Sequence, residues 1–406
     1  MKSVLSGRDL REGLESLDSQ TGRLGPRPPG GAELVSALES SELRGRGGAA
    51  FPAAVKWRSV AQSRARARAV LVNGAEGEPL SGKDHALMCA RPHLVLDGAA
   101  IAAETIGADE VVVYINRHDT AAATAMRRAL LERPVREQRR TRFVAAPPRY
   151  VAGEESAAVH CVNEGVALPT ATPPRPFESG IAGRPTLVHN VETLAHVAMI
   201  ARFGGEWFQA LGAGAPGTVL LTMSGAVGAP GVIEVPQGAT IAEAVDVCGG
   251  VTHPPVAVLL GGYFGAWIGA ASAWGTRLDA AALRAAGSTL GCGVVSVLAD
   301  DRCGVLETAR IASYLADESA RQCGPCVFGL RAVAQAMHRI AAGTAEPDEQ
   351  ARVHRWATQL SGRGACHHPD GVVAMLLSAL GVFADEFAAH AQRRGCTLRR
   401  RGAAAA

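Results

Sequence analysis

The first half of the chain alternates short apolar runs with helical segments, and this rhythm restricts the possible fold more than any other feature. Strands are expected at residues 69–74, 110–116 and 142–147. Helices are expected at 94–106, from Asp119 as N-cap through 131, and at 188–203. Alternation of this kind predicts an α/β domain, a largely parallel sheet covered by helices.

The second half has a different texture. From about Gly217 the pattern reads strand, turn, strand and helix, which is typical of a compact β-grasp unit. From about Cys303 it is helical, with helices expected at 304–316, 326–342, 349–360 and 371–392. We therefore predict an α/β domain at 1–215, a β-grasp domain at 216–300, a helical domain at 301–395 and a disordered basic tail at 396–406.

Composition excludes several classes of function. The net charge of +3 is small, and aromatic residues make up 4% of the 406 residues, so the arginine-rich patches predict solvated faces and no nucleic-acid site. The N-terminal stretch lacks an apolar core of signal-peptide length, and the glycines within 256–274 favour a buried strand and turn over a membrane span. Nine cysteines, an odd number, favour metal or redox chemistry in a cytoplasmic protein.

Lysine is rare and therefore informative. Of 41 basic residues only Lys2, Lys56 and Lys83 are lysine. A chain so biased toward arginine is expected to keep lysine where a compact ammonium group is needed. Two of the three lie in glycine-rich stretches, which favours a functional reading.

The first glycine-rich stretch, "LRGRGGAAFPAAVKW" at 43–57, contains a formal GxGxxA pattern. A dinucleotide fingerprint must follow a strand, whereas the residues before this one look helical, so the pattern alone is weak. Consecutive glycines nevertheless let backbone N–H groups approach an anion, and Lys56 can add positive charge. A glycine-rich turn with an incidental lysine is the alternative.

Two further stretches carry polar side chains at positions where ligands bind. "LVNGAEGEPLSGKD" at 71–84 follows a strand directly, and the carboxyl edge of an α/β sheet is a common ligand site. It offers Asn73, Glu76 and Glu78. "YVAGEESAAVHC" at 150–161 places acids at a helix start, where they also complement the helix dipole.

Together these stretches resemble one family. "RGRGGAAFPAAVKW", "VNGAEGEP", "YVAGEESA", "SGIAGRPTLVHNVETLAHV" and "ADESARQCGPCVFGLR" occur in the order found in the flavin- and NADH-binding subunit of respiratory complex I and related diaphorase subunits. The resemblance covers residues 38–390. It implies a Rossmann-like FMN domain with a parallel sheet, a β-grasp domain and a C-terminal helical bundle that holds a 4Fe–4S cluster.

The resemblance also implies roles for individual residues. It assigns the phosphate side of FMN to Gly45, Gly47 and Lys56, and it assigns the flavin pocket to Asn73, Glu76, Tyr150, Gly153, Glu154, Glu155, Asn190 and Thr193. Phe51 is expected to stack on the adenine of the nicotinamide nucleotide. Glu78 and Glu155 are expected to face its ribose, where carboxylates repel a 2′-phosphate and favour NADH over NADPH. Tyr150 and Glu78 are the expected catalytic residues.

The chain departs from the family pattern around the nucleotide. Ala75 stands where a second carboxylate is expected, and Arg175 replaces the aromatic residue after the twin prolines. Thr172 replaces a lysine and Ser59 replaces a further aromatic residue. An arginine plane can still stack on a base. The nucleotide site is therefore expected to be remodelled.

The cysteine motif is incomplete. The family pattern CxxCxxC reads here as Ala320, Cys323 and Cys326, and the distant fourth cysteine corresponds to Cys366. Three thiolates are therefore expected to hold the cluster, either a 4Fe–4S cluster with a fourth ligand from His367 or His368 or an incomplete 3Fe–4S cluster. The remaining thiols are interpreted as core or surface groups: Cys89, Cys161, Cys248, Cys292, Cys303 and Cys396.

The expected function is that of a flavin-dependent oxidoreductase. Electrons pass from NADH, the substrate, through FMN and the cluster to a protein acceptor, a ferredoxin-like or thioredoxin-like iron–sulfur protein or a multisubunit partner. Two alternatives stay open at this point. The chain is an FMN and iron–sulfur subunit that does not use NADH, or a scaffold subunit that has lost its cofactors.

Overall fold

A computed structural model of the chain describes residues 3–6, 13–392 and 396, and these divide into two compact units. The first unit contains the residues up to 77 together with 81–222 and 232–239. The second contains 78–80, 223–231 and the residues from 240 onward. The predicted basic tail lies outside the described residues except for Cys396, which is buried.

A four-stranded parallel sheet organises the first unit, with the strand order β3-β2-β1-β4. The strands are β1 (Ala69–Gly74), β2 (Glu110–Asn116), β3 (Thr141–Ala146) and β4 (Thr186–Asn190). The register sets the Cα atom of Asn73 opposite Tyr114 on one side and Asn190 on the other. Because the strands are parallel, their carboxyl ends meet at one edge of the sheet.

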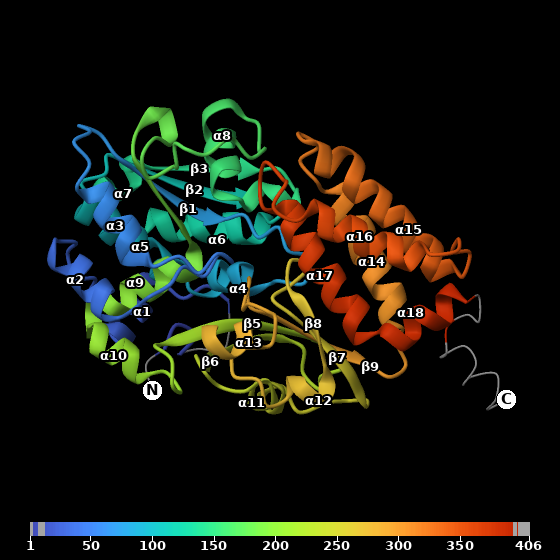
Figure 1. Cartoon of the computed structure of the whole chain (residues 1–406). Coiled ribbons are helices and arrows are strands. Elements are labelled where there is room, and N and C mark those ends of the chain that lie inside the picture. The colour runs from blue at the N-terminus through green and yellow to red at the C-terminus, as the bar shows by residue number, and fades with distance from the viewer. Residues whose placement is uncertain (1–2, 7–12, 393–395, 397–406) are drawn as a thin grey trace. The chain divides into compact units, whose positions relative to one another are not determined.

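Both faces of this sheet are covered, which explains why the two central strands, β1 and β2, are apolar along most of their length. Val72 packs into the cluster that contains Leu194. Its neighbour Leu71 points the other way, into the cluster that contains Ala158. Figure 1 shows α5, α6 and α9 along one side of the sheet and α8 on the other. A parallel sheet buried on two faces favours continuous apolar runs over alternation.

The helices of the first unit connect and cover these strands. They are α1 (Leu17–Leu24), α2 (Glu33–Ser40), α3 (Ala53–Ala61), α4 (Lys83–Ala90), α5 (Pro92–Ile106), α6 (Thr120–Leu131), α7 (Val135–Arg140), α8 (Glu155–Glu164), α9 (Val191–Phe203) and α10 (Gly205–Ala210). Short 3₁₀ turns are η2 (Tyr150–Gly153) and η3 (Ile181–Gly183).

One predicted helix of this unit is partly a strand. The sequence predicts a helix over 188–203, but residues 186–190 form β4 and the helix begins only at Val191. Pairing with β1 favours the extended form of this short apolar run. The side chain of Asn190 accepts a hydrogen bond from the backbone N–H of Glu192 and so caps the helix that follows.

The second sheet is mixed, with the strand order β6-β5-β9-β7-β8. Its strands are β5 (Thr218–Gly225), β6 (Gly231–Pro236), β7 (Pro255–Leu260), β8 (Ala266–Gly269) and β9 (Val294–Ala299). Strand β7 is antiparallel to both β8 and β9. The division into units runs through β5 and β6.

The helices of the second unit follow the predicted pattern between residues 304 and 360. They are α11 (Ile241–Val247), α12 (Ala270–Ala273), α13 (Ala280–Ala285), α14 (Gly304–Asp317), the π-helical turn η4 (Pro325–Leu330), α15 (Arg331–Ala342), α16 (Glu349–Leu360), α17 (His368–Val382) and α18 (Ala384–Ala391). The predicted β-grasp and helical segments pack together, since α17 lies on β8 and Trp267 N donates to Ser378 Oγ (2.9 Å).

The last predicted helix, 371–392, is broken in the structure. Helices α17 and α18 are bent by 86° where they meet, and Phe383 at the break has φ −108° and ψ 30°. The Phe383 ring packs edge-on against Trp267 with centroids 5.2 Å apart. A Cβ on Gly304 would lie 2.4 Å from that ring. Tertiary packing of one aromatic ring therefore overrides a continuous helical pattern.

No single helix in the described part of the chain has the length and apolar character needed to cross a membrane. Two bent helix pairs, α4 with α5 and α17 with α18, meet the length and composition requirement only when each pair is taken together.

Candidate functional site

The predicted flavin residues of the first unit gather where β1 and β4 end. Asn73 and Asn190 are paired in register at this edge of the sheet. Asn73 Nδ2 donates to the carbonyl oxygen of Gly153 (2.9 Å) and thereby ties the end of β1 to the η2 turn. The structure therefore brings the "VNGAEGEP" and "YVAGEESA" stretches together, although some 80 residues separate them.

Two glycines allow this contact. A Cβ on Gly153 would lie 2.6 Å from the carbonyl oxygen of Ala75, and one on Gly77 would lie 2.7 Å from that of Tyr150. Backbone cannot shift as a flexible side chain can, so both positions require glycine. The predicted pocket residues Gly153 and Tyr150 are thus held by close backbone packing.

The glycine-rich loop at 45–50 is anchored on the first turn of α9. The backbone N–H of Arg46 donates to Thr193 Oγ1 (2.9 Å), and that of Gly45 donates to the carbonyl oxygen of Phe51 (2.8 Å). A Cβ on Gly47 would lie 3.4 Å from Cβ of Asn190. Five predicted cofactor residues from two distant stretches therefore form one neighbourhood.

The group most informative about cofactor binding consists of Lys56, Phe51 and Glu155. Lys56 on α3 makes an ion pair with Glu155, the first residue of α8. Lys56 Nζ also lies 5.7 Å from the centroid of the Phe51 ring. The predicted phosphate cation, the predicted adenine-stacking ring and a predicted ribose-side carboxylate are thus neighbours.

Two of the predicted acidic residues cap helices. Glu76 accepts hydrogen bonds from the backbone N–H groups of Asp84 and His85 (3.1 Å each) at the start of α4. Glu154 is the N-cap of α8 and accepts from Ala157 N (2.9 Å). Both carboxylates therefore have a structural role, and their predicted contact with flavin stays a prediction.

Sequence reasoning flagged Lys83 as a rare lysine but gave it no partner. In the structure it is buried and forms ion pairs with Asp84 (2.8 Å) and Glu192 (2.8 Å). Burial alone would lower the pKa of Lys83, but these carboxylates outweigh it and raise that pKa above its usual value. Asn190 joins the group, because its Nδ2 donates to Asp84 Oδ2 (2.6 Å).

Glu192 is the fully buried centre of this charged group. Its Oε1 accepts from the backbone N–H of Leu220 (2.9 Å) and lies 3.8 Å from Arg46 Nε and 3.6 Å from His196 Nε2. Burial by itself would raise the pKa of Glu192, but Lys83, His196 and Arg46 outweigh burial and hold it at about 2. The carboxylate is therefore charged at neutral pH.

The structure assigns Glu78 to the second unit. Its carboxylate is buried and accepts hydrogen bonds from the backbone N–H groups of Tyr263 (2.8 Å) and Leu80 (3.2 Å). A Cβ on Gly262 would lie 2.7 Å from Glu78 Oε2. The carboxylate thus orders the turn after β7, and its predicted contact with a ribose stays a prediction.

The residues that replace the expected adenine clamp lie at the surface. Arg175 is exposed, and its backbone N–H donates to Glu178 Oε2 (2.8 Å). Thr172 is exposed as well. Stacking of Arg175 on a base stays a prediction.

Three cysteines of the second unit converge as the sequence predicts. Cys323 and Cys326 flank the start of η4, and Cys366 lies just before α17. Burial, and after it the nearby Cys323 and Cys366 thiols, together raise the pKa of Cys326 to about 12. Three thiols from two chain segments, each beside a helix start, are a ligand set that fits an iron–sulfur cluster.

The expected fourth ligands are placed differently from each other. His367 is fully exposed, and its Nδ1 lies 3.4 Å from Asp370. His368 is buried, and its Nε2 donates to the carbonyl oxygen of Leu315 (2.7 Å). To bind iron through Nε2, His368 would have to give up that hydrogen bond. Ala320, at the position of the missing cysteine, is buried.

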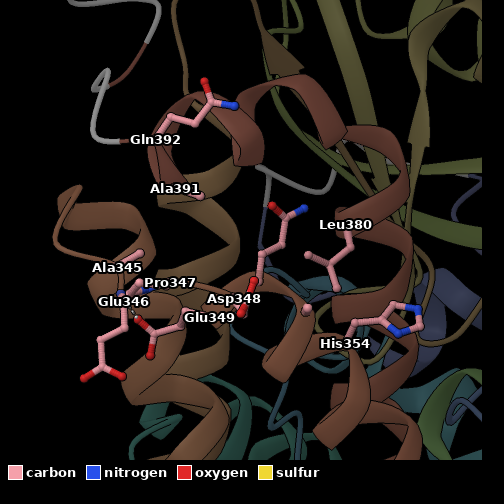
Figure 2. A pocket seen from close by; sticks show the side chains of 11 residues that line it. Ala345, Glu346, Pro347, Asp348, Glu349, His354, Leu380, Ala391 and Gln392 are labelled. Carbon is pink, nitrogen blue, oxygen red and sulfur yellow. Dashed lines mark hydrogen bonds between the residues drawn. The ribbon is translucent and has the colours of Figure 1, made fainter.

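The second unit also has a pocket away from the predicted site residues. Among the residues that the structure describes, none of the predicted site residues lines this pocket. Figure 2 shows its lining side chains, which come from the start of α16 and from α17 and α18. The residues are Ala345, Glu346, Pro347, Asp348, Glu349, Gln350, Ala351, His354, Leu380, Ala391 and Gln392. Glu346 and Glu349 are already paired with Arg352.

Family models match three stretches of the chain. One described as the Nuo51 FMN-binding domain matches residues 38–199, and an SLBB domain matches residues 220–261. A third, described as the NADH-ubiquinone oxidoreductase-F iron-sulfur binding region, matches residues 307–390. Their order follows the predicted α/β, β-grasp and helical segments.

Whole proteins are similar as well. An F-type subunit of the NADH-quinone oxidoreductase of Rhizobium meliloti (strain 1021) is 32% identical over 378 residues, which cover 90% of this chain and 90% of that protein. The NADP-reducing hydrogenase subunit HndC of Solidesulfovibrio fructosivorans is 29% identical, with 90% and 77% covered. A crystal structure of an NAD⁺-reducing NiFe hydrogenase in the H₂-reduced state matches with a TM-score of 0.81 at 29% identity, and the match covers 88% of this chain and only 62% of that one.

The fold and these ligand sets define a flavin- and iron–sulfur-containing oxidoreductase component. The chain belongs to the family of F-type subunits of NADH-quinone oxidoreductase. This membership confirms the predicted resemblance, the fold class and the FMN and iron–sulfur cofactors. The predicted activity, an NADH dehydrogenase module with FMN, is that of the family.

The buried charge of Glu192 generates a testable prediction about stability. Glu192→Gln leaves Lys83 with an incomplete set of counter-charges, so the free energy of unfolding should fall by about 3–5 kcal/mol at neutral pH. Because the folded pKa of about 2 lies below the ordinary 4.5, the stabilisation is present above 4.5 and is lost as pH falls toward 2. Urea unfolding at several pH values measures both effects.

Glu39→Gln is the matched control, because Glu39 pairs with Arg58 at the exposed surface. It should cost about 0–1 kcal/mol. A difference between wild type and Glu192→Gln that does not shrink as pH is lowered through that window would contradict the assigned charge of Glu192.

Proposed function

We propose that this chain oxidises NADH with FMN and an iron–sulfur cluster as its cofactors and delivers the electrons to a separate iron–sulfur protein. The observation that carries the proposal is the neighbourhood of Lys56, Phe51 and Glu155 beside α8, which is joined to the sheet edge through Gly153 and Asn73. When bound, FMN supplies the conversion between two-electron hydride chemistry and single-electron transfer.

The chain's own residues have distinct tasks in this proposal. Lys56 supplies a cation for the flavin phosphate, and the glycine-rich loop at 45–48 lets the phosphate approach the backbone. Asn73 and Gly153 orient the flavin ring, and Phe51 stacks on the adenine of the nucleotide. Glu155 partly neutralises the positive charge of Lys56 through their ion pair. Together with Glu78 it disfavours a nucleotide that carries a 2′-phosphate.

In this proposal three thiolates hold the cluster: those of Cys323, Cys326 and Cys366. No cysteine occupies the fourth ligand position. The N-terminal ends of η4 and α17 add backbone N–H dipoles that stabilise the negative charge of the cluster. Fewer thiolate ligands leave the cluster less negative, so its reduction potential is raised.

The electron acceptor is proposed to be a ferredoxin-like or thioredoxin-like iron–sulfur protein within a larger assembly. Supporting this, the relatives are named as subunits of NADH-quinone oxidoreductase and of hydrogenase. A cytoplasmic location is proposed from the cysteine usage, with all nine thiols free.

One specific observation favours the second candidate, a flavin and iron–sulfur subunit that does not use NADH. Arg175 and Thr172, which replace the expected adenine clamp, are exposed and offer no aromatic ring. A scaffold without cofactors is less well supported, because three thiols still converge and Lys56 is still placed beside Phe51.

Lys56→Ala should weaken FMN binding by about 1.5–3 kcal/mol, since a charge-assisted phosphate contact is lost. Fluorescence titration of the apoprotein with FMN measures this. Arg58→Ala, an exposed cation on the same helix, should leave the affinity unchanged. If the double variant Lys56→Ala/Glu155→Gln regains wild-type affinity, the loss came from an unpaired Glu155 and the phosphate role is wrong.

NADH should bleach the flavin much faster than NADPH does, because the Glu78 and Glu155 carboxylates disfavour a 2′-phosphate. Stopped-flow mixing under argon, followed by flavin absorbance, measures both rates. Glu155→Gln should lower the ratio of the NADH rate to the NADPH rate. If dithionite reduces the flavin while neither nucleotide does, the second candidate function holds instead.

Cys366→Ser should lower the iron content and abolish the EPR signal of the cluster, because one of three thiolate ligands is removed. Ala320→Cys should raise the iron content and lower the reduction potential by adding a thiolate. Cys248→Ser, a buried thiol outside the motif, is the control and should change neither. His368→Ala tests the nitrogen ligand: conversion of the signal to a 3Fe–4S type identifies His368, whereas an unchanged signal excludes it.

A further inference from the structure

A second group of metal-ligand side chains lies in the second unit, apart from the three motif cysteines in sequence. Cys303, His390 and Cys396 are all buried, and one ligand atom from each lies within 4.8 Å of the others. Cys303 precedes α14, and His390 lies near the end of α18. Sequence reasoning interpreted Cys303 and Cys396 as ordinary thiols, because no short spacing connects them.

The separations suit a tetrahedral ion. Zinc–sulfur and zinc–nitrogen bonds of about 2.3 and 2.1 Å place two donors about 3.6 Å apart around a tetrahedral centre. The observed separation between Cys303 Sγ and His390 Nε2 is 3.5 Å. The Cys303 and His390 side chains therefore need little movement to accept an ion, and the Cys396 thiol lies within 4.8 Å of both.

The imidazole of His390 is fixed in the form that binds metals. Its Nδ1 lies 3.1 Å from the carbonyl oxygen of Ala341, which can only accept a hydrogen bond, so Nδ1 carries the proton. The lone pair of Nε2 therefore points to the side on which Cys303 lies. A backbone carbonyl on the second nitrogen is a common way to orient a zinc-binding histidine.

Glu386 supplies an oxygen donor one helical turn before His390. Its Oε2 lies 3.5 Å from Cys303 Sγ and accepts a hydrogen bond from the backbone N–H of Gly304 (3.1 Å). Residues four apart on a helix face the same side, so Glu386 and His390 both point toward Cys303. Two thiols and one imidazole thus lie together, with one carboxylate beside Cys303.

We propose that Cys303, His390 and Cys396, with Glu386 as the oxygen donor, bind one Zn²⁺ ion. Two thiolates and an imidazole select zinc over magnesium or calcium, which prefer oxygen ligands. Binding releases the two thiol protons to solvent. The ion links the start of α14 to α18 and to Cys396, which follows α18 in the sequence. Its proposed role is structural. The proposal is independent of the proposed electron-transfer function.

Two simpler accounts make different predictions. Buried thiols that serve only as small apolar groups would need no imidazole or carboxylate beside them, and burying those polar groups has a cost. A Cys303–Cys396 disulfide would consume both thiols and leave no zinc site. Metal analysis and mass spectrometry distinguish these accounts.

The experiment is metal analysis of the full-length protein, purified without oxygen and dialysed against EDTA. About one zinc per chain is expected, in addition to the iron of the cluster. Protein expressed with cobalt in place of zinc should show ligand-field absorption in the red, beyond the flavin and cluster bands. Zinc absent from the purified protein together with no cobalt absorption would overturn the proposal.

Variants then test the ligands. Cys303→Ser, His390→Ala and Cys396→Ser should each lower the zinc content at least about tenfold, and Glu386→Gln should weaken zinc binding roughly tenfold. Cys248→Ser is the matched control and should retain zinc. Iron and flavin content in the same samples report whether each variant folds.

The remaining outcomes also decide the matter. Zinc retained in all three ligand variants would place it elsewhere and overturn the proposal, as would a Cys303–Cys396 disulfide in protein kept under reducing conditions. Should a ligand variant fail to fold, the zinc content and cobalt spectrum of the unsubstituted protein still test the site.

Discussion

The first unit depends on an ion pair that water does not reach, between Lys83 and Glu192. Two charges removed from water are costly unless each has further partners. Asp84, Arg46 and the backbone N–H of Leu220 provide them. Through these contacts the pair fixes the start of α4, the start of α9, the glycine-rich loop and β5 relative to one another. Four of the predicted flavin residues, Gly45, Gly47, Asn190 and Thr193, lie in that glycine-rich loop or at the start of α9.

This buried group explains how a cofactor site can be built mostly from loops. The loops after β1 and before α8 are held by close backbone packing at Gly77 and Gly153, and the loop before α3 is tied to Thr193. The side chains proposed to contact the ligand can then stay nearer the surface. Lys56 and Glu155 form such a proposed pair, partly exposed and opposite in charge. A backbone fixed in this way, with charged side chains nearer the surface, suits the proposed site, in which FMN stays bound while NADH enters and leaves.

The second unit contains two groups of side chains that are proposed to bind metal, and only one of them can be recognised from the sequence. Cys323 and Cys326 are separated by two residues beside a helix start, so the motif is evident even with Ala320 in the first place. Cys303 and His390 are 87 residues apart and meet only because Phe383 breaks the last helix and turns α18 back toward the start of α14. That break is caused by packing of the ring on Trp267 and Gly304.

The sequence alone determined the α/β alternation and the positions of three strands of the first sheet, and it predicted the residues of the iron–sulfur motif. These follow from local patterns, since apolar runs, caps and short cysteine spacings act over a few residues. Tertiary structure decided the rest: that residues 186–190 pair with β1, that Lys83 finds Glu192, and that Cys303 meets His390. Each of these contacts depends on which distant segment supplies a partner. A buried backbone edge or charge is costly without a hydrogen-bond or ion-pair partner, and only the fold decides which residue provides one.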